Sequence, residues 1–76
     1  MTAPRAWLDK QGGYVYLRVD GQWYENEIEY NVWEAAYTTC AWMRKNAYDA
    51  WMRKNAYELH PREAARLEKD RKRRKQ

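Results

Sequence analysis

The sequence predicts a small α+β fold: a two- or three-stranded antiparallel β-meander, then a long α-helix that is straight or bent, then a basic C-terminal helix or arm. Three observations predict it. Residues 14–19 are dense in β-branched and aromatic types, residues 26–59 contain neither Gly nor Pro, and residues 62–76 are strongly basic. At 76 residues the chain suits one domain. We assign residues 1–61 to that domain, with a hairpin at 14–25 and a helix at about 26–59, and residues 62–76 to a basic helical tail.

The hairpin carries the strongest local signal. Asp20-Gly21 joins two strand-like runs in the way that favours a two-residue type I′ turn, in which both residues need a positive φ. The turn sets the expected cross-strand pairs: Val19 with Gln22, Arg18 with Trp23, Leu17 with Tyr24 and Tyr16 with Glu25. Because side chains alternate along a strand, Leu17 and Tyr24 are expected on the core face. Arg18 and Trp23 share the other face, where they are expected to form a cation–π pair or an aromatic binding surface. Before the hairpin, Trp7-Leu8 is expected to be a short edge strand or an anchored arm.

The long helix is predicted from apolar spacing. Asn26 is the expected N-cap, and apolar residues recur at helical spacings of three and four from Tyr30 to Leu59. His60-Pro61 ends this segment, because the residue before a proline avoids helical backbone angles. Pro61 is well suited to the first position of a further helix.

A tandem repeat lies inside this segment. Residues 41–49 recur as residues 50–58, with eight of nine positions identical. Nine residues at about 100° each turn through about 900°, so equivalent residues of the two copies point in opposite directions along one straight helix. Trp42, Met43 and Tyr57 then form a second apolar face, which we expect to dock on a partner protein or a second copy of the chain. The alternative is a bend between the copies that returns both tryptophans to one core.

Charge is unevenly distributed along the chain. The formal net charge is +4, but residues 62–76 contain eight basic and three acidic residues, whereas residues 20–34 contain five acids and no Lys or Arg. A basic end attracts polyanions and acidic surfaces in a salt-dependent way. The alternative interpretation is that this basic end is only a solvated tail that keeps the protein soluble.

The composition argues against catalysis. Ser is absent, the single Cys40 lies on the apolar spacing, and the single His60 is expected to be a capping or surface residue. We therefore expect no catalytic residue, metal site or cofactor. One cysteine suits a reducing compartment, no signal-peptide pattern is present, and the longest uncharged run, 35–43, is shorter than the roughly 20 residues of a membrane span. We therefore expect the protein to be cytoplasmic and not to associate with a membrane.

These observations lead to one hypothesis and two alternatives. The leading hypothesis is a small non-enzymatic binding protein that inhibits or modulates a larger complex that handles nucleic acid. Its expected partner contacts are Trp42, Met43, Tyr57, Trp23 and Arg18. The first alternative is direct DNA or RNA binding by cations that would equally contact an acidic protein surface: Arg44, Lys45, Arg53, Lys54, Arg66, Lys69, Arg71, Lys72, Arg73, Arg74 and Lys75. The second is a metal-free, ribonuclease-like toxin that uses Arg, Lys, Tyr and His60.

In its size, its lack of catalytic groups and its repeat, the chain is similar in kind to small accessory proteins of bacteriophages. Such proteins bind and inhibit host machinery, for example RNA polymerase or CRISPR complexes. The resemblance implies a role in host takeover and a protein target.

Overall fold

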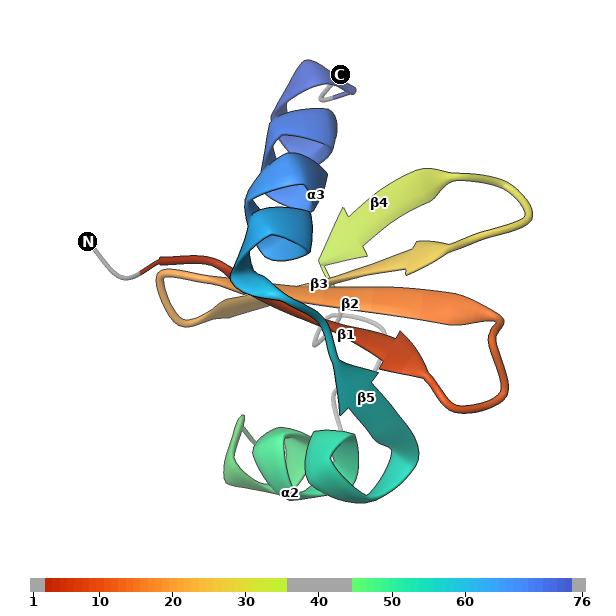
Figure 1. The fold of residues 1–76 in the computed structure, drawn as a ribbon, viewed down its shortest axis with the longest axis vertical. Coiled ribbons are helices and arrows are strands. Elements are labelled where there is room, and N and C mark those ends of the chain that lie inside the picture. The colour runs from red at the N-terminus through yellow and green to blue at the C-terminus, as the bar shows by residue number, and fades with distance from the viewer. Residues whose placement is uncertain (1–2, 36–44, 75–76) are drawn as a thin grey trace.

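In the part of the chain that the structure describes, the fold is a five-stranded antiparallel sheet with α2 on one face and α3 on the other (Figure 1). The structure, a computed structural model, describes residues 3–35 and 45–74. Its strands lie in the order β4-β3-β2-β1-β5. The elements are β1 (Arg5–Asp9), β2 (Tyr14–Val19), β3 (Gln22–Glu27), β4 (Val32–Ala35), α2 (Lys45–Asn55), β5 (Ala56–Glu58) and α3 (Pro61–Arg73). The class is α+β, but the predicted architecture of a short meander followed by one long helix is wrong.

The hairpin forms with the predicted register. Arg18 lies opposite Trp23 and Leu17 opposite Tyr24, as the Asp-Gly turn requires. Asp20 has a φ of 49° and Gly21 a φ of 80°, so both turn residues occupy the left-handed region that a type I′ turn demands. The preceding segment, β1, is a strand as expected. It lies inside the sheet between β2 and β5, not at an edge.

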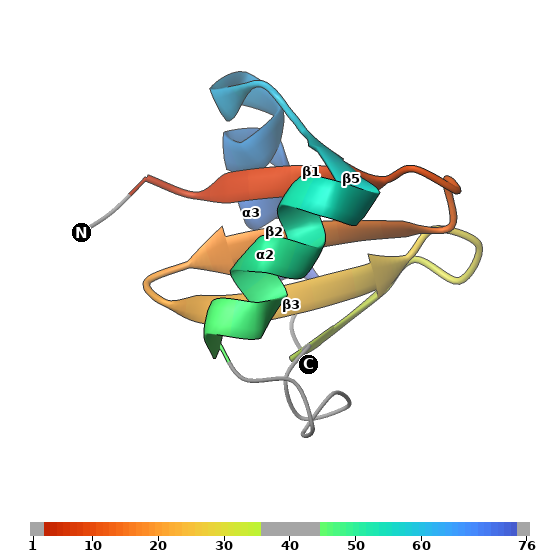
Figure 2. The ribbon, with the colours of Figure 1, turned by 90° about the horizontal axis from the view of Figure 1, so that it is seen from below.

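Each face of the sheet has its own hydrophobic core. On one face, Trp7, Tyr16 and Trp23 pack against Met52 of α2. On the other face, Ala6 and Leu17 pack against Ala64 of α3. Figure 2, viewed from the α2 side, shows that helix lying across the strands while α3 lies behind them. Because α2 covers the face on which Trp23 lies, this side chain is only 1% exposed and belongs to the core together with Tyr16.

The predicted helix over residues 26–59 is wrong at its beginning. Strand β3 continues to Glu27, and the chain then turns into β4. The backbone amides of Tyr30 and Asn31 both donate to the Glu27 carbonyl, and Asn31 adopts a φ of 52°. Asn26 is buried in the strand, where its side-chain amide donates to Asn31 Oδ1 at 3.0 Å instead of capping a helix. An asparagine in the left-handed region thus supplies a turn without glycine.

The two copies of the repeat do not have the same secondary structure, although α2 contains residues 45–49 of the first copy and residues 50–55 of the second. Ala47-Tyr48 lies in α2, whereas the identical Ala56-Tyr57 lies in β5. The helix ends at Asn55, whose carbonyl accepts from the Lys10 backbone amide at 3.0 Å. The Lys10 ammonium donates to the carbonyl of Lys54 at 2.9 Å. The rotation argument for a second apolar helix face therefore does not apply, because the second copy leaves the helix after its sixth residue.

Helix α3 is part of the core. His60 is its N-cap, since its Nδ1 accepts from the Arg62 backbone amide at 3.1 Å, and Pro61 opens the first turn as predicted. Ala64 is fully buried against the sheet, and Leu67 packs beside it. Of the two predicted alternatives, a basic helix or an arm, residues 61–73 form the helix, and this helix is docked on the sheet.

Met52 is the main buried contact of α2 with the sheet, at 1% exposure. We expect Met52→Ala to lower the free energy of unfolding by about 2–5 kcal/mol, because it removes packed apolar atoms and leaves a cavity. The neighbouring Arg53 is exposed, so Arg53→Ala should change stability by no more than about 0.5 kcal/mol. Urea denaturation followed by tryptophan fluorescence measures both. Equal losses in the two variants would contradict the packing of α2 on the sheet.

Candidate functional site

The outward face of α3 presents a line of cations. Ala64 and Leu67 point into the core, so the 3.6-residue periodicity turns positions 62, 66, 69 and 73 toward solvent. All four of these residues are exposed. We call this set the basic stripe: Arg62, Arg66, Lys69 and Arg73. With a rise of 1.5 Å per residue, the stripe runs for roughly 16 Å along the helix.

The acids of α3 leave most of this charge uncancelled. Glu63 binds one member of the stripe, Arg66, at 2.6 Å. Glu68 is buried and bound to Arg71 through two hydrogen bonds of 2.6 and 3.0 Å, off the stripe. Asp70 likewise binds a cation outside the stripe, Arg74, at 3.0 Å. Within residues 3–35 and 45–74, Arg62, Lys69 and Arg73 form no ion pair, so the stripe keeps a strong positive potential.

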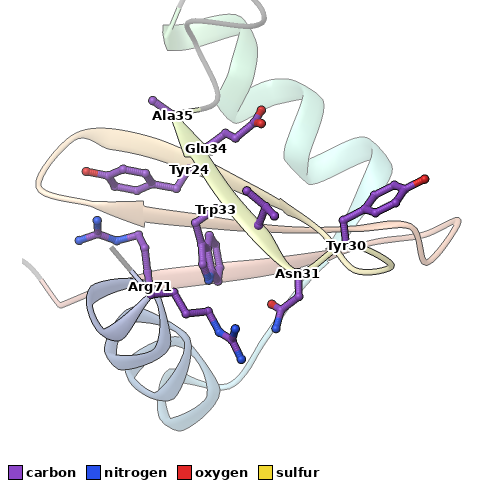
Figure 3. Close-up of a pocket in the computed structure, with 9 residues that line it drawn as sticks. Tyr24, Tyr30, Asn31, Trp33, Glu34, Ala35 and Arg71 are labelled. Carbon is purple, nitrogen blue, oxygen red and sulfur yellow. The ribbon is translucent and has the colours of Figure 1, made fainter. Parts of the chain in front are cut away.

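A groove of about 690 Å³ lies beside α3, between this helix and β4. Figure 3 shows Trp33 projecting from β4 toward the helix, with Tyr24 on the neighbouring strand. The Trp33 indole N–H donates to Asp70 Oδ2 at 3.1 Å, and the Arg71 guanidinium lies 4.1 Å from the centre of the Tyr24 ring. These contacts join the outer strand to the last turns of α3, so they hold the C-terminal part of the basic stripe in a fixed position.

The pKa values of Asp70 and Arg71 are shifted by their hydrogen-bond partners. The hydrogen bond from Trp33, together with the Arg74 guanidinium, lowers the pKa of Asp70 below its usual value. The hydrogen bond to Glu68 raises the pKa of Arg71 above its usual value. Both side chains are therefore held in their charged forms at neutral pH.

Of the described residues predicted to contact a partner protein, Arg18 and Trp23 lie together on the hairpin, whereas Tyr57 lies on β5. Trp23 is buried, and Arg18 lies over its ring at 5.5 Å, which is the cation–π pair that the hairpin register predicted. Tyr57 is 61% exposed on β5, where the Lys10 ammonium lies 5.4 Å from its ring centre. Trp42 and Met43 lie outside the described residues.

The residues predicted to bind nucleic acid fall into two groups on opposite faces of the sheet. Arg53 and Lys54 are exposed at the end of α2, which Lys45 begins, while the remaining described cations belong to α3 and its C-cap. Arg44 and Lys75 lie outside the described residues. Within α3, Arg71 faces the sheet, and Arg62, the first residue of the predicted basic tail, completes the stripe. A helical projection of residues 61–73 would have found it.

The pKa of Asp70 generates a pH prediction. Because this pKa is lower in the folded chain than in the unfolded chain, the stabilisation from its contacts is present at neutral pH and is lost as pH falls through the folded pKa. We expect Asp70→Asn to be less stable than wild type at pH 7, and the difference to shrink in acid, as the carboxylate becomes protonated. Urea denaturation at neutral and at acidic pH tests this. A difference that is independent of pH would show that the carboxylate charge does not fasten α3 to β4.

Within the described ranges, no group of three or more His, Cys, Asp or Glu side chains is placed to hold a metal ion. The helices of those ranges include none that is both long enough and apolar enough to cross a bilayer. No protein-family model, curated protein or solved structure matches the chain.

Proposed function

We propose that this chain is a non-enzymatic nucleic-acid-binding protein whose basic stripe on α3 contacts the phosphate backbone. The observation that carries the proposal is the exposed line of Arg62, Arg66, Lys69 and Arg73 on a helix fixed to the sheet. Cations held in a row along a rigid helix match a repeating anionic backbone, and each phosphate contact releases condensed counterions.

The composition of the stripe favours nucleic acid over an acidic protein. Protein interfaces depend on a few large side chains that enter pockets, and most commonly on aromatic anchors. Along the outer face of α3 the only apolar side chain between the cations is Ala65. The stripe has no Asn or Gln that would read adenine, and we assign its Arg and Lys side chains to phosphate oxygens, the contacts that position a protein on the backbone.

The acids of the sheet do not oppose this binding mode. Glu25 and Glu27 alternate with Tyr24 and Asn26 along β3, and their side chains lie on the same face as Trp23, which α2 covers. A phosphate backbone on α3 therefore approaches the face of the sheet from which these carboxylates point away. The sheet itself therefore separates Glu25, Glu27 and Glu34 from the basic stripe.

Modulation of a larger nucleic-acid-handling complex stays a prediction alongside this proposal. Its expected aromatic contact face was derived from one continuous helix, and that helix is absent from the described residues. The basic helix is the part of that hypothesis that the geometry supports, because a protein bound near nucleic acid uses the same phosphate contacts. Direct binding is the simpler function and is tested first.

The test is fluorescence anisotropy with labelled single-stranded DNA, duplex DNA and RNA over a range of salt concentrations. Wild type should bind at low salt with a steep salt dependence. We expect Lys69→Gln/Arg73→Gln to weaken binding uniformly across sequences and to reduce the slope of log K against log salt by about 1.4–1.8, since each lost phosphate contact contributes about 0.7 on single strands and 0.9 on duplex.

The matched control is Arg53→Gln/Lys54→Gln, which removes the same charge from the end of α2 on the opposite face. This variant should bind almost as wild type does. Equal weakening by the two double variants would show attraction by net charge alone, and an absence of binding by wild type at low salt would refute the function.

A further inference from the structure

A second surface lies at the end of the sheet where the β1–β2 and β3–β4 turns meet. The Ile28 backbone amide donates to the Gly13 carbonyl at 3.1 Å and so joins the two turns. Four large apolar or aromatic side chains are exposed around this junction, at fractions from 36% to 65%, and we call them the turn patch: Tyr14, Ile28, Tyr30 and Val32. Among the described residues, the remaining exposed side chain of this kind is Tyr57, far away on β5. Large apolar side chains gathered at one place mark interaction surfaces.

The turn patch borders a hollow of about 250 Å³ that also contains carboxylates. Tyr14, Tyr30 and Val32 line it together with Glu25, Glu27 and Glu34. The strand register explains this grouping, because Glu27 lies opposite both Tyr14 on β2 and Val32 on β4. The Tyr14 ring stacks on Tyr16 at 6.2 Å with an angle of 17° between the rings, so one wall of the hollow is held in place by the core.

The hollow has a negative potential. The pKa of the Tyr14 hydroxyl is raised above its usual value, chiefly by the charge of Glu27, with further contributions from burial, Glu25 and Glu34. A phenol that resists ionisation next to carboxylates reports a site where an added anion is unfavourable and an added cation is favourable. Tyrosine rings add to this preference, because their faces attract ammonium and guanidinium groups.

We propose that the turn patch binds a basic segment of a partner protein, in which a Lys or Arg head group enters the hollow and neighbouring apolar side chains cover Ile28 and Val32. Charge complementarity selects this occupant. A polyanion would be repelled by Glu27 and Glu34, and a wholly apolar segment would desolvate these carboxylates without a partner. Only a segment that carries both a cation and apolar side chains satisfies the rings and the carboxylates together.

This inference does not rest on the proposed nucleic-acid function. The hollow lies on the α2 side of the sheet, as the shared face of Glu25, Glu27 and Trp23 shows, whereas the basic stripe lies on α3. The two surfaces can therefore be occupied at the same time. A loss at one should leave the other unchanged, so the two proposals fail separately.

The experiment uses two labelled heptapeptides, one of alternating Lys and Val and one with Glu in place of each Lys. Anisotropy at low salt should show binding of the Lys peptide and none of the Glu peptide. We expect Glu34→Gln and Tyr30→Ala each to weaken binding of the Lys peptide about three- to tenfold. Both side chains are exposed, so circular dichroism should show an unchanged fold in both variants.

Glu29→Gln is the matched control, because Glu29 is an exposed acid in the β3–β4 turn that does not line the hollow. It should bind the Lys peptide within twofold of wild type, as should Lys69→Gln/Arg73→Gln. Equal weakening by Glu29→Gln and Glu34→Gln, or equal binding of the two peptides, would overturn the proposal. A third outcome would also overturn it: the Lys peptide does not bind, and sedimentation shows a dimer that Glu34→Gln dissociates. The occupant of the turn patch would then be a second copy of the chain.

Discussion

The pairing of β5 with β1 places the two helices, α2 and α3, on opposite faces of the sheet. Three residues, 56–58, pair antiparallel with β1, and the backbone amide of Leu59 continues the contact by donating to the Ala6 carbonyl at 2.8 Å. The Arg5 guanidinium binds the Glu58 carboxylate through two hydrogen bonds of 2.8 and 3.0 Å, which lower the pKa of that carboxyl. Because this strand crosses the sheet edge between the two helices, α2 covers one face and α3 the other (Figure 1). A chain of this size buries little surface, and covering both faces of one sheet lets β1, β2 and β3 each contribute to two cores.

The repeat shows how strongly this pairing overrides local preference. The same Lys-Asn-Ala-Tyr sequence is helical at residues 45–48, whereas at residues 54–57 it ends a helix and enters a strand. Local propensity is identical in the two copies, so the difference comes from their surroundings. In the second copy Ala56 is buried opposite Asp9, and Lys10 satisfies the carbonyls at the end of α2 with its backbone amide and its ammonium. Residues 56–58 form a strand because the edge of β1 offers backbone groups for pairing. A count of helix-forming residues along the chain does not reveal this edge.

The parts that could be predicted from the sequence are those governed by neighbours along the chain. The Asp20-Gly21 turn sets the register of β2 with β3, and His60-Pro61 sets the start of α3. The predicted long helix is wrong because a segment without Gly and Pro can still turn: Asn31 reaches a positive φ and closes the turn between β3 and β4. At the candidate site, helical periodicity alone locates the basic stripe. The bond from Trp33 to Asp70 that fixes the helix beside β4 joins residues far apart in the chain, so it needs the fold.

The fold converts a separation of charge along the sequence into a separation across the sheet. In β3 and β4 the period of two directs Glu25, Glu27 and Glu34 to the α2 side. In α3 the period of 3.6 directs the small Ala64 inward and the stripe outward. The net charge of +4 therefore understates the field at either surface, since positive and negative groups are divided by a layer of buried aromatic and aliphatic side chains. Such a division orients an approaching polyanion toward α3 and an approaching cation toward the turn patch, so that one small domain can contact two partners of opposite charge without either competing for the other's surface.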